Sequence, residues 1–254
     1  MTQHEPLTGT LRVGIDDRVF DQVEEYVLGL VAVPRITVVA GDPEVGAALT
    51  AAEDALHAAG LDKAAVSALP PVAAWREAYR AVGVNPNRFP CAAESLIRRV
   101  AKGDRLPRIN SAVDLCNSVS ISAHLPVASC DVGDIDGRLD VRPADGGEKY
   151  LPLGSPDAVE HPDAGEIVYA DQAGRAHSRR WNWRQSDVVR TDLGERRLLV
   201  TVEAVHPGGR EQVEAALDRI TVLLERFGVV RPERAVLDRT SRSAELFTPE
   251  GARR

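Results

Sequence analysis

Charged and aromatic side chains gather in two short segments of this sequence. Residues 98–108 contain a single acid against five cations, which are Arg98, Arg99, Lys102, Arg105 and Arg108. Their local field attracts anions, of which phosphate is the commonest, so we predict that these five side chains bind phosphate. The second segment is RRWNWRQ at 179–185. Its indoles, Trp181 and Trp183, have the flat apolar surface that stacks on a base or an aromatic side chain.

The charge of the chain limits how it can bind a polyanion. A formal charge of −7 over 254 residues argues against non-specific coating of nucleic acid, DNA included, because that mode needs broad neutralisation of phosphates. The charge is uneven, however. Eight basic and three acidic residues give 76–108 a net charge of +5, whereas four basic and twelve acidic residues give 109–175 a net charge of −8. We therefore expect a polyanion to dock on one face only.

We expect no disulfide framework, metal site, cofactor or membrane segment. Cys91, Cys116 and Cys130 are few and irregularly spaced, and their odd number fits a reducing compartment, the cytoplasm. The start, MTQHEPLTGT, lacks the features of a signal peptide, and the longest apolar run, 26–34, is too short to span a bilayer. No histidine spacing suggests a metal, and GDPEVG does not fit a nucleotide-binding glycine loop.

The secondary structure predicted around these two segments is a mixture of strands and helices along the chain. Hydrophobic periodicity predicts helices over 43–59, 71–82, 91–102, 111–123 and 211–227, the fourth with Ser111 as N-cap. Strands are predicted over 11–15, 26–33, 36–40, 138–142, 148–153, 166–170, 176–184 and 197–205. The fold class is therefore α+β, with a mixed sheet and helices packed around it. We expect one domain over 1–228, with 229–254 as a polar C-terminal tail outside it.

Three motifs, in order, resemble the B3/B4 domain of the phenylalanyl-tRNA synthetase β subunit. They are LPRINSAVDLCNSVS, then LPVASCDVGDIDGRLDVRPADGGEKYLPL, then GEIVYADQAGRAHSRRWNWRQ. The WNWR sequence resembles free-standing B3/B4 proteins more closely, and the resemblance covers 69–227. It implies a B3/B4 fold and a role in editing, which in the synthetase is the hydrolysis of tyrosine wrongly esterified to phenylalanine tRNA. A free-standing copy would edit in trans, with the tRNA 3′ end or an aminoacyl-tRNA as its partner and the five cations of 98–108 on its phosphates.

The resemblance also assigns substrate-binding positions. Ala128 stands where the synthetase motif has histidine, and the synthetase's glycine-rich loop falls near Trp183, Arg184 and Gln185. Glu203 matches the acid that recognises the tyrosine hydroxyl, whereas the later threonine-containing motif has no counterpart. We therefore predict that Glu203, Trp183, Gln185, Asn110 and Ala128 bind the substrate, whose shape differs from that of the synthetase substrate.

Hydrolysis of an activated ester needs a positioned water and a stabilised oxyanion. Asn117, Asn182 and Gln185 can orient water, and Arg184 can face the oxyanion. If 179–185 is a strand, alternation places Arg180, Asn182 and Arg184 on one side and the two indoles on the other. We predict Asn182, Arg184 and Asn117 as catalytic residues.

Two further functions fit the same residues. One is a non-catalytic module that binds a small amino acid or an RNA end, and the other is a hydrolase of an unrelated amino-acid ester or amide. Ordinary structural roles also remain open: the cations could end a solvated helix, Asn110 could cap a turn, and Glu203 could be paired with an arginine. The editing hypothesis requires that the stretch from Arg98 to Asp131, which begins with these cations, and the segment 179–185 border one pocket.

Overall fold

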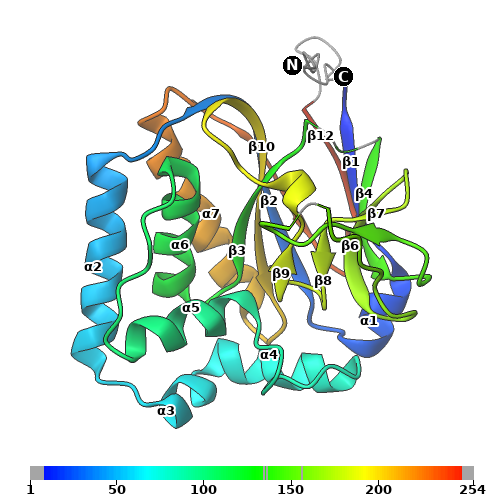
Figure 1. The fold of residues 1–254 in the computed structure, drawn as a ribbon, viewed down its shortest axis with the longest axis horizontal. Helices are drawn as coiled ribbons and strands as arrows, with labels where there is room; N and C mark the ends of the chain where they lie inside the picture. Colours follow the sequence, from blue (N-terminus) through cyan, green and yellow to red (C-terminus); the bar gives the residue numbers. More distant parts are fainter. Residues whose placement is uncertain (1–8, 134, 136, 156, 248–254) are drawn as a thin grey trace.

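The computed structural model describes residues 9–133, 135, 137–155 and 157–247, and it confirms an α+β fold. A six-stranded sheet has the order β12-β1-β4-β6-β7-β5 (Figure 1). Its strands are β1 (Leu11–Ile15), β4 (Arg138–Pro143), β5 (Lys149–Tyr150), β6 (Ile167–Asp171), β7 (Arg175–Ala176) and β12 (Ser243–Leu246). A four-stranded sheet has the order β11-β2-β10-β3. Its strands are β2 (Val27–Val38), β3 (Val127–Asp131), β10 (Gly194–Ala204) and β11 (Glu233–Leu237).

Helices cover one face of the four-stranded sheet and one end of the molecule. Helices α6 (Ser111–Ala123) and α7 (Gly209–Glu225) pack on that sheet, and α2 (Pro43–Ala59) lies outside α6. The remaining helices are α1 (Asp17–Gln22), α3 (Lys63–Ala68), α4 (Pro70–Ala81) and α5 (Ala92–Ala101). Figure 1 shows α3, α4 and α5 at the lower end, and the six-stranded sheet on the side away from α2.

The four-stranded sheet is buried on both faces, and this decides where its side chains point. Along β2, Leu28 and Leu30 enter a core between the two sheets, whereas Val31 and Val33 enter a second core under α6 and α7. Alternation along β10 has the same result: Val200 and Val202 face the helices. The intervening residues of β10, which include Thr201 and Glu203, therefore face the space between the sheets.

Residues 176–184 do not form the predicted continuous strand. The structure has a two-stranded ribbon, β8 (Ser178–Arg179) and β9 (Arg184–Gln185), joined by a turn over 180–183. Arg180 and Trp181 have positive φ angles of 45° and 66°. The predicted alternation of Arg180, Asn182 and Arg184 against the indoles is therefore wrong, because a turn, and not a pleated strand, carries these side chains.

The C-terminal residues correct a second expectation. Residues 233–246 do not lie outside the fold, since β11 pairs with β2 and β12 pairs with β1. Residues 248–254 of the predicted tail and 1–8 of the N-terminal segment lie outside the described residues. Helices α1 and α3 and strands β3, β11 and β12 were not predicted from the sequence. Within the described ranges, no helix combines the length and the apolar character that crossing a bilayer requires.

Candidate functional site

A pocket of ≈ 610 Å³ opens between the two sheets and is bordered by α5, α6 and the 180–183 turn. Seven of the eight predicted catalytic and substrate-binding residues line it: Asn117, Ala128, Asn182, Trp183, Arg184, Gln185 and Glu203. They come from α6, β3, β10 and the β8–β9 ribbon with its turn. The second sequence segment and the motif that follows the cations therefore do border a common pocket.

The turn over 180–183 brings three side chains, Trp181, Asn182 and Trp183, to this pocket at a cost in backbone strain. Positive φ angles in consecutive non-glycine residues each cost about 1–3 kcal/mol and persist only where packing holds them. Trp181 supplies that packing. Its indole is fully buried and meets the rings of Tyr26 and Trp75 edge-on, at centroid distances of 4.9 Å and 5.2 Å. The turn thereby fixes Asn182, the next residue, at the wall of the pocket.

Glu203 is a buried carboxyl that accepts hydrogen bonds from neutral donors. Its Oε1 accepts from Tyr26 Oη at 2.7 Å and from Trp181 Nε1 at 3.1 Å, and its Oε2 accepts from Asn182 Nδ2 at 2.8 Å. Burial raises the pKa of Glu203 above its usual range, although hydrogen bonds from Tyr26, Asn182, Tyr169 and Trp181 favour the charged form. No cation is among these contacts, so the alternative that Glu203 is paired with an arginine is wrong.

Both polar atoms of the Asn182 side-chain amide have hydrogen-bond partners, which fix its orientation. Tyr79 Oη donates to Asn182 Oδ1 at 2.8 Å, which leaves the Asn182 amide nitrogen to donate to Glu203. Asn182 therefore holds the Glu203 carboxyl in place and has its Oδ1 occupied. This differs from the predicted role, in which Asn182 orients a catalytic water.

Two other predicted residues have structural partners. Asn110 does not line the pocket: it is the N-cap of α6, where its Oδ1 accepts from the backbone of Ala112 and Val113, and its Nδ2 donates to Thr191 O. The N-cap is thus Asn110 and not Ser111. Gln185 lines the pocket, and its Nε2 donates to Ser129 O at 2.8 Å, which ties β9 to β3.

The cysteines of the pocket are protonated thiols. Cys116 and Cys130 both line it, and burial raises the pKa of each thiol to about 12. The thiolate, and not the thiol, is the nucleophile in cysteine chemistry. Neither residue therefore serves as a nucleophile at neutral pH. Among the described residues, no three His, Cys, Asp or Glu side chains are grouped to hold a metal ion.

His177 is a pocket residue that the sequence reasoning set aside. Its ring is buried, its Nε2 lies 3.0 Å from Asp171 Oδ2, and its buried Nδ1 has no hydrogen-bond partner among the described residues. Burial raises the pKa of Asp171, but hydrogen bonds from His177 and Arg175 outweigh it and hold that pKa well below the usual range. Asp171 Oδ2 accepts a hydrogen bond from Nε2 and so fixes the orientation of the ring. Its position two residues before RRWNWRQ was the available signal.

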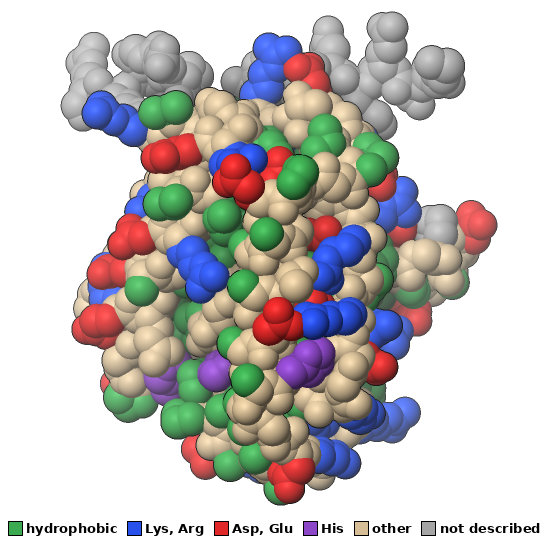
Figure 2. Space-filling model, turned by 90° about the vertical axis from the view of Figure 1, so that its left-hand side faces the viewer, with side chains coloured by type: hydrophobic (Ala, Val, Ile, Leu, Met, Phe, Trp, Pro, Cys, Tyr) green, Lys and Arg blue, Asp and Glu red, His purple; other side chains and the backbone are tan. Residues whose placement is uncertain are grey.

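The five predicted phosphate-binding cations do not line the pocket, and three of them have carboxylate partners. Glu53, fully buried on α2, pairs with Arg105 and Arg108, and Glu94 pairs with Arg98 at 2.6 Å. On the face that carries α2, basic and acidic side chains are interspersed (Figure 2). Arg99 and Lys102 lie exposed at the end of α5. The high density of cations in 98–108 thus serves largely to neutralise buried glutamates.

Comparison with protein families shows which family this chain belongs to. The model of the B3/4 domain matches residues 74–228, more than half of the chain. The chain belongs to the B3/4 domain family. This confirms the resemblance that its motifs indicated. No curated protein sequence matches the chain.

The chain is similar to an N-terminal fragment of the phenylalanyl-tRNA synthetase β-subunit from Pyrococcus horikoshii, with a TM-score of 0.45 and 11% sequence identity. The alignment covers 96% of this chain and 56% of that one, so the chain spans little more than half of the fragment's length.

Proposed function

We propose that this B3/4 domain protein is a trans-editing hydrolase that binds the 3′ end of a mischarged tRNA and hydrolyses its aminoacyl ester. The observation that carries the proposal is the Glu203 carboxyl, which lines the pocket and whose hydrogen-bond donors among the described residues are all neutral. A negative charge in a water-poor pocket attracts a cation strongly. The α-ammonium group of an aminoacyl ester is such a cation, and it lies next to the ester carbonyl.

The volume of the pocket supports a ligand of this class. Small-molecule sites are commonly about 300–1,000 Å³ and combine apolar walls with a few placed polar groups. At ≈ 610 Å³, with Leu96, Val113 and Ile135 among its walls, this pocket meets that description. Proposed contacts are Glu203 with the ammonium group and the apolar walls with the amino-acid side chain.

His177 supplies the proton transfer in this proposal. Its Nδ1 is buried in the structure, so the proposal requires that substrate binding admits a water to this atom; the water then gives its proton to Nδ1 as the water oxygen adds to the ester carbonyl carbon. When the carbon–oxygen bond to ribose breaks, the same nitrogen returns the proton to the ribose oxygen. Asp171 holds the ring through Nε2, and Asn117 and Arg184 are proposed to contact the water and the oxyanion. His177 would thus act in place of the histidine that Ala128 replaces.

The test is ester loss from a panel of mischarged tRNAs, followed with the purified chain against a buffer control. We expect multiple turnovers on at least one tRNA, at least 10-fold slower hydrolysis by Glu203→Gln, and at least 100-fold slower hydrolysis by His177→Gln. His57→Gln, on α2 and away from the pocket, is the matched control and keeps the wild-type rate. Wild-type ester lifetimes equal to those in buffer would refute the proposal.

A second candidate is a binding module without catalysis. One observation favours it: Asn182 and Gln185 already have protein partners, which leaves fewer groups to position water. A binder would lengthen the lifetime of the ester in proportion to occupancy, whereas a hydrolase shortens it. A hydrolase of free amino-acid esters would act equally well without the tRNA body, and its rate would respond little to salt.

A further inference from the structure

Three arginines and two aromatic rings form a layered group at the edge of the pocket. Arg180 Cζ lies 3.8 Å from the centroid of the Phe89 ring, and Arg184 Cζ lies 4.4 Å from that of Trp183. Arg88 Cζ lies 5.0 Å from the Phe89 ring, and the two rings meet edge-on at 4.8 Å. We call this group the arginine–aromatic stack; its members are Arg88, Phe89, Arg180, Trp183 and Arg184. Two segments far apart in sequence build it: the loop between α4 and α5, and the 180–185 ribbon.

The arginines of the stack differ from those of 98–108 in their partners. Among the described residues, none of the guanidinium groups of Arg88, Arg180 and Arg184 pairs with a carboxylate. Glu166, an acid that contacts the start of the turn, accepts from the backbone nitrogen of Arg180 and from the side chain of Arg179. The stack therefore concentrates three positive charges whose contacts are ring faces. Such charges remain available to an anion.

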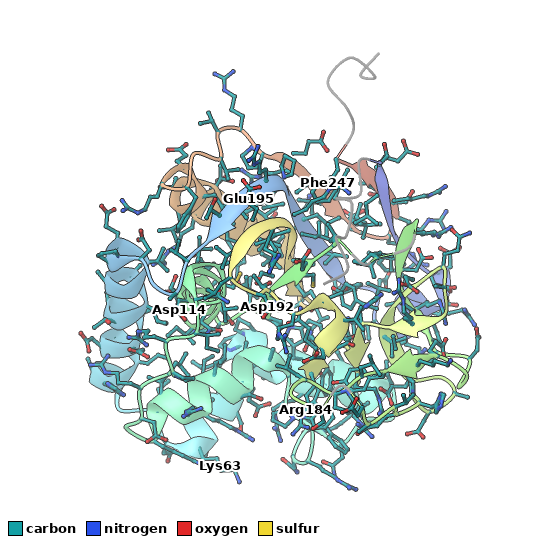
Figure 3. The ribbon with its side chains drawn as sticks, turned by 45° about the horizontal axis from the view of Figure 1, so that its top comes forward. Lys63, Asp114, Arg184, Asp192, Glu195 and Phe247 are labelled. Carbon is teal, nitrogen blue, oxygen red and sulfur yellow. The ribbon has the colours of Figure 1, made fainter. Side chains whose placement is uncertain are left out.

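The stack is continuous with the pocket. Trp183 and Arg184 belong to both, and Arg184 is exposed to solvent. Figure 3 shows Arg184 beside the β8–β9 ribbon, at the end of the molecule where α4 lies. A chain that passes over the stack can therefore place its end in the pocket. The acidic charge of the protein as a whole, −7, confines polyanion binding to local sites such as this one.

We propose that the arginine–aromatic stack binds a single-stranded RNA end whose terminal residue enters the pocket; this inference rests on the proposed function. Guanidinium groups bind phosphate through paired N–H donors, and aromatic faces stack on bases with little sequence preference. Both chemistries occur together in single-stranded nucleic acid. An acidic peptide offers the charge without the bases, and it is the competing outcome that the experiment separates.

The experiment measures binding of uncharged tRNA, and of a short RNA with the same 3′ sequence, over a range of salt concentrations. Removal of one phosphate contact lowers the slope of log K against log[salt] by about 0.7–0.9. Arg88→Gln and Arg184→Gln are each expected to lower the slope by about that amount and to weaken binding about 5-fold. Arg88 is exposed and has no hydrogen-bonded side-chain partner among the described residues, so its loss leaves the fold intact, which circular dichroism checks.

Matched controls come from the other cationic segment. Arg99→Gln and Lys102→Gln also remove one exposed charge each, and we expect both to keep the wild-type slope. A slope that changes in these controls and not in Arg88→Gln or Arg184→Gln would overturn the inference. So would binding of a poly-glutamate peptide as tight as that of RNA, or the absence of RNA binding by the wild type.

A fluorescence signal reports the location of the RNA. Trp75 and Trp181 are fully buried, whereas Trp183 is partly exposed, so a stacking base quenches chiefly Trp183. We expect RNA to quench the wild type and not Trp183→Phe. The two proposals fail separately. RNA binding through the stack without ester loss would refute the hydrolase alone, whereas hydrolysis of aminoacyl-adenosine with unchanged salt slopes in the variants would refute this inference alone.

Discussion

Glu53 and Glu203 are both buried carboxyls, and their surroundings differ in one respect. Glu53 accepts from Arg105, Arg108 and the backbone nitrogen of Leu106. Burial raises the pKa of Glu53, but those hydrogen bonds and charges outweigh it and hold the pKa below its usual range. Glu203 accepts from neutral donors, and burial raises its pKa. The charge of the Glu53 carboxyl is balanced by arginines of the protein itself. The Glu203 carboxyl lines a pocket, and we propose that a cationic ligand is its positive partner.

The comparison of Glu53 with Glu203 shows how a charge that stabilises the fold differs from a charge that binds a ligand. A buried charge destabilises the folded protein unless it is paired. A buried charge whose partner is another residue of the fold therefore needs no ligand. The same distinction applies to the cations: those of 98–108 largely complete pairs with Glu53 and Glu94, and those of the arginine–aromatic stack do not. Clusters of charge in sequence do not reveal this, because the partners lie elsewhere in the chain.

The largest expected effect is on stability, at Glu53. Replacing Glu53 with Gln removes the carboxylate that Arg105 and Arg108 share, although Arg105 keeps its pair with Asp54, and we expect a loss of about 2–3 kcal/mol at pH 7. Urea unfolding measures it as a lower midpoint with an unchanged m-value. Because the folded pKa of Glu53 is lowered, its stabilisation is complete above the unfolded pKa and is lost as pH falls through the folded pKa. Equal stability of variant and wild type would break the comparison.

The next effect concerns the indole that faces Glu203. Trp181→Phe removes the hydrogen bond from Nε1 to Glu203 and leaves a cavity beside Trp75 and Tyr26, so we expect a loss of about 2 kcal/mol. Trp183→Phe is the matched control, with a loss below about 0.5 kcal/mol because that ring is partly exposed. Thermal unfolding of both variants measures the difference, and equal losses would contradict the account of the turn.

The smallest expected effect, that of replacing Arg105, tests whether the cations of 98–108 have a structural role. Arg105 is about half exposed, and Arg108 also neutralises Glu53, so Arg105→Gln should lower the unfolding midpoint far less than Glu53→Gln does. We also expect it to leave tRNA affinity and its salt dependence unchanged. A drop of several-fold in tRNA affinity at low salt would show that 98–108 binds phosphate after all.

The sequence predicted the elements that carry their own boundary signals. Helix α2 has the predicted bounds because Asp42 caps it, Pro43 begins it and Gly60 ends it in the left-handed region. Helix α6 likewise spans 111–123 as predicted. Strands β11 and β12 were missed because their sequences are polar, and pairing with distant strands stabilises them.

The residues of the site were predictable from the sequence at positions that match the family motifs and not at other positions. Motif positions placed Ala128 and Glu203 in the pocket without any knowledge of the fold. The alternation of RWNWR resembles that of a strand, whereas the structure has a turn there with positive φ angles at Arg180 and Trp181 and with the indole of Trp181 fully buried. His177 was set aside because no histidine spacing suggests a metal, and its contact with Asp171 becomes visible only in the structure.

The most direct test of the account is a thermodynamic cycle on Glu203. Calorimetry compares a non-hydrolysable 3′-aminoacylamino-adenosine with its counterpart that lacks the α-amine, in the wild type and in Glu203→Gln. If Glu203 binds the ammonium group, loss of the amine weakens wild-type binding at least 10-fold and leaves binding to the variant unchanged, a coupling of about 1.4 kcal/mol. An equal penalty in both proteins, or no binding of either compound, would contradict the central claim.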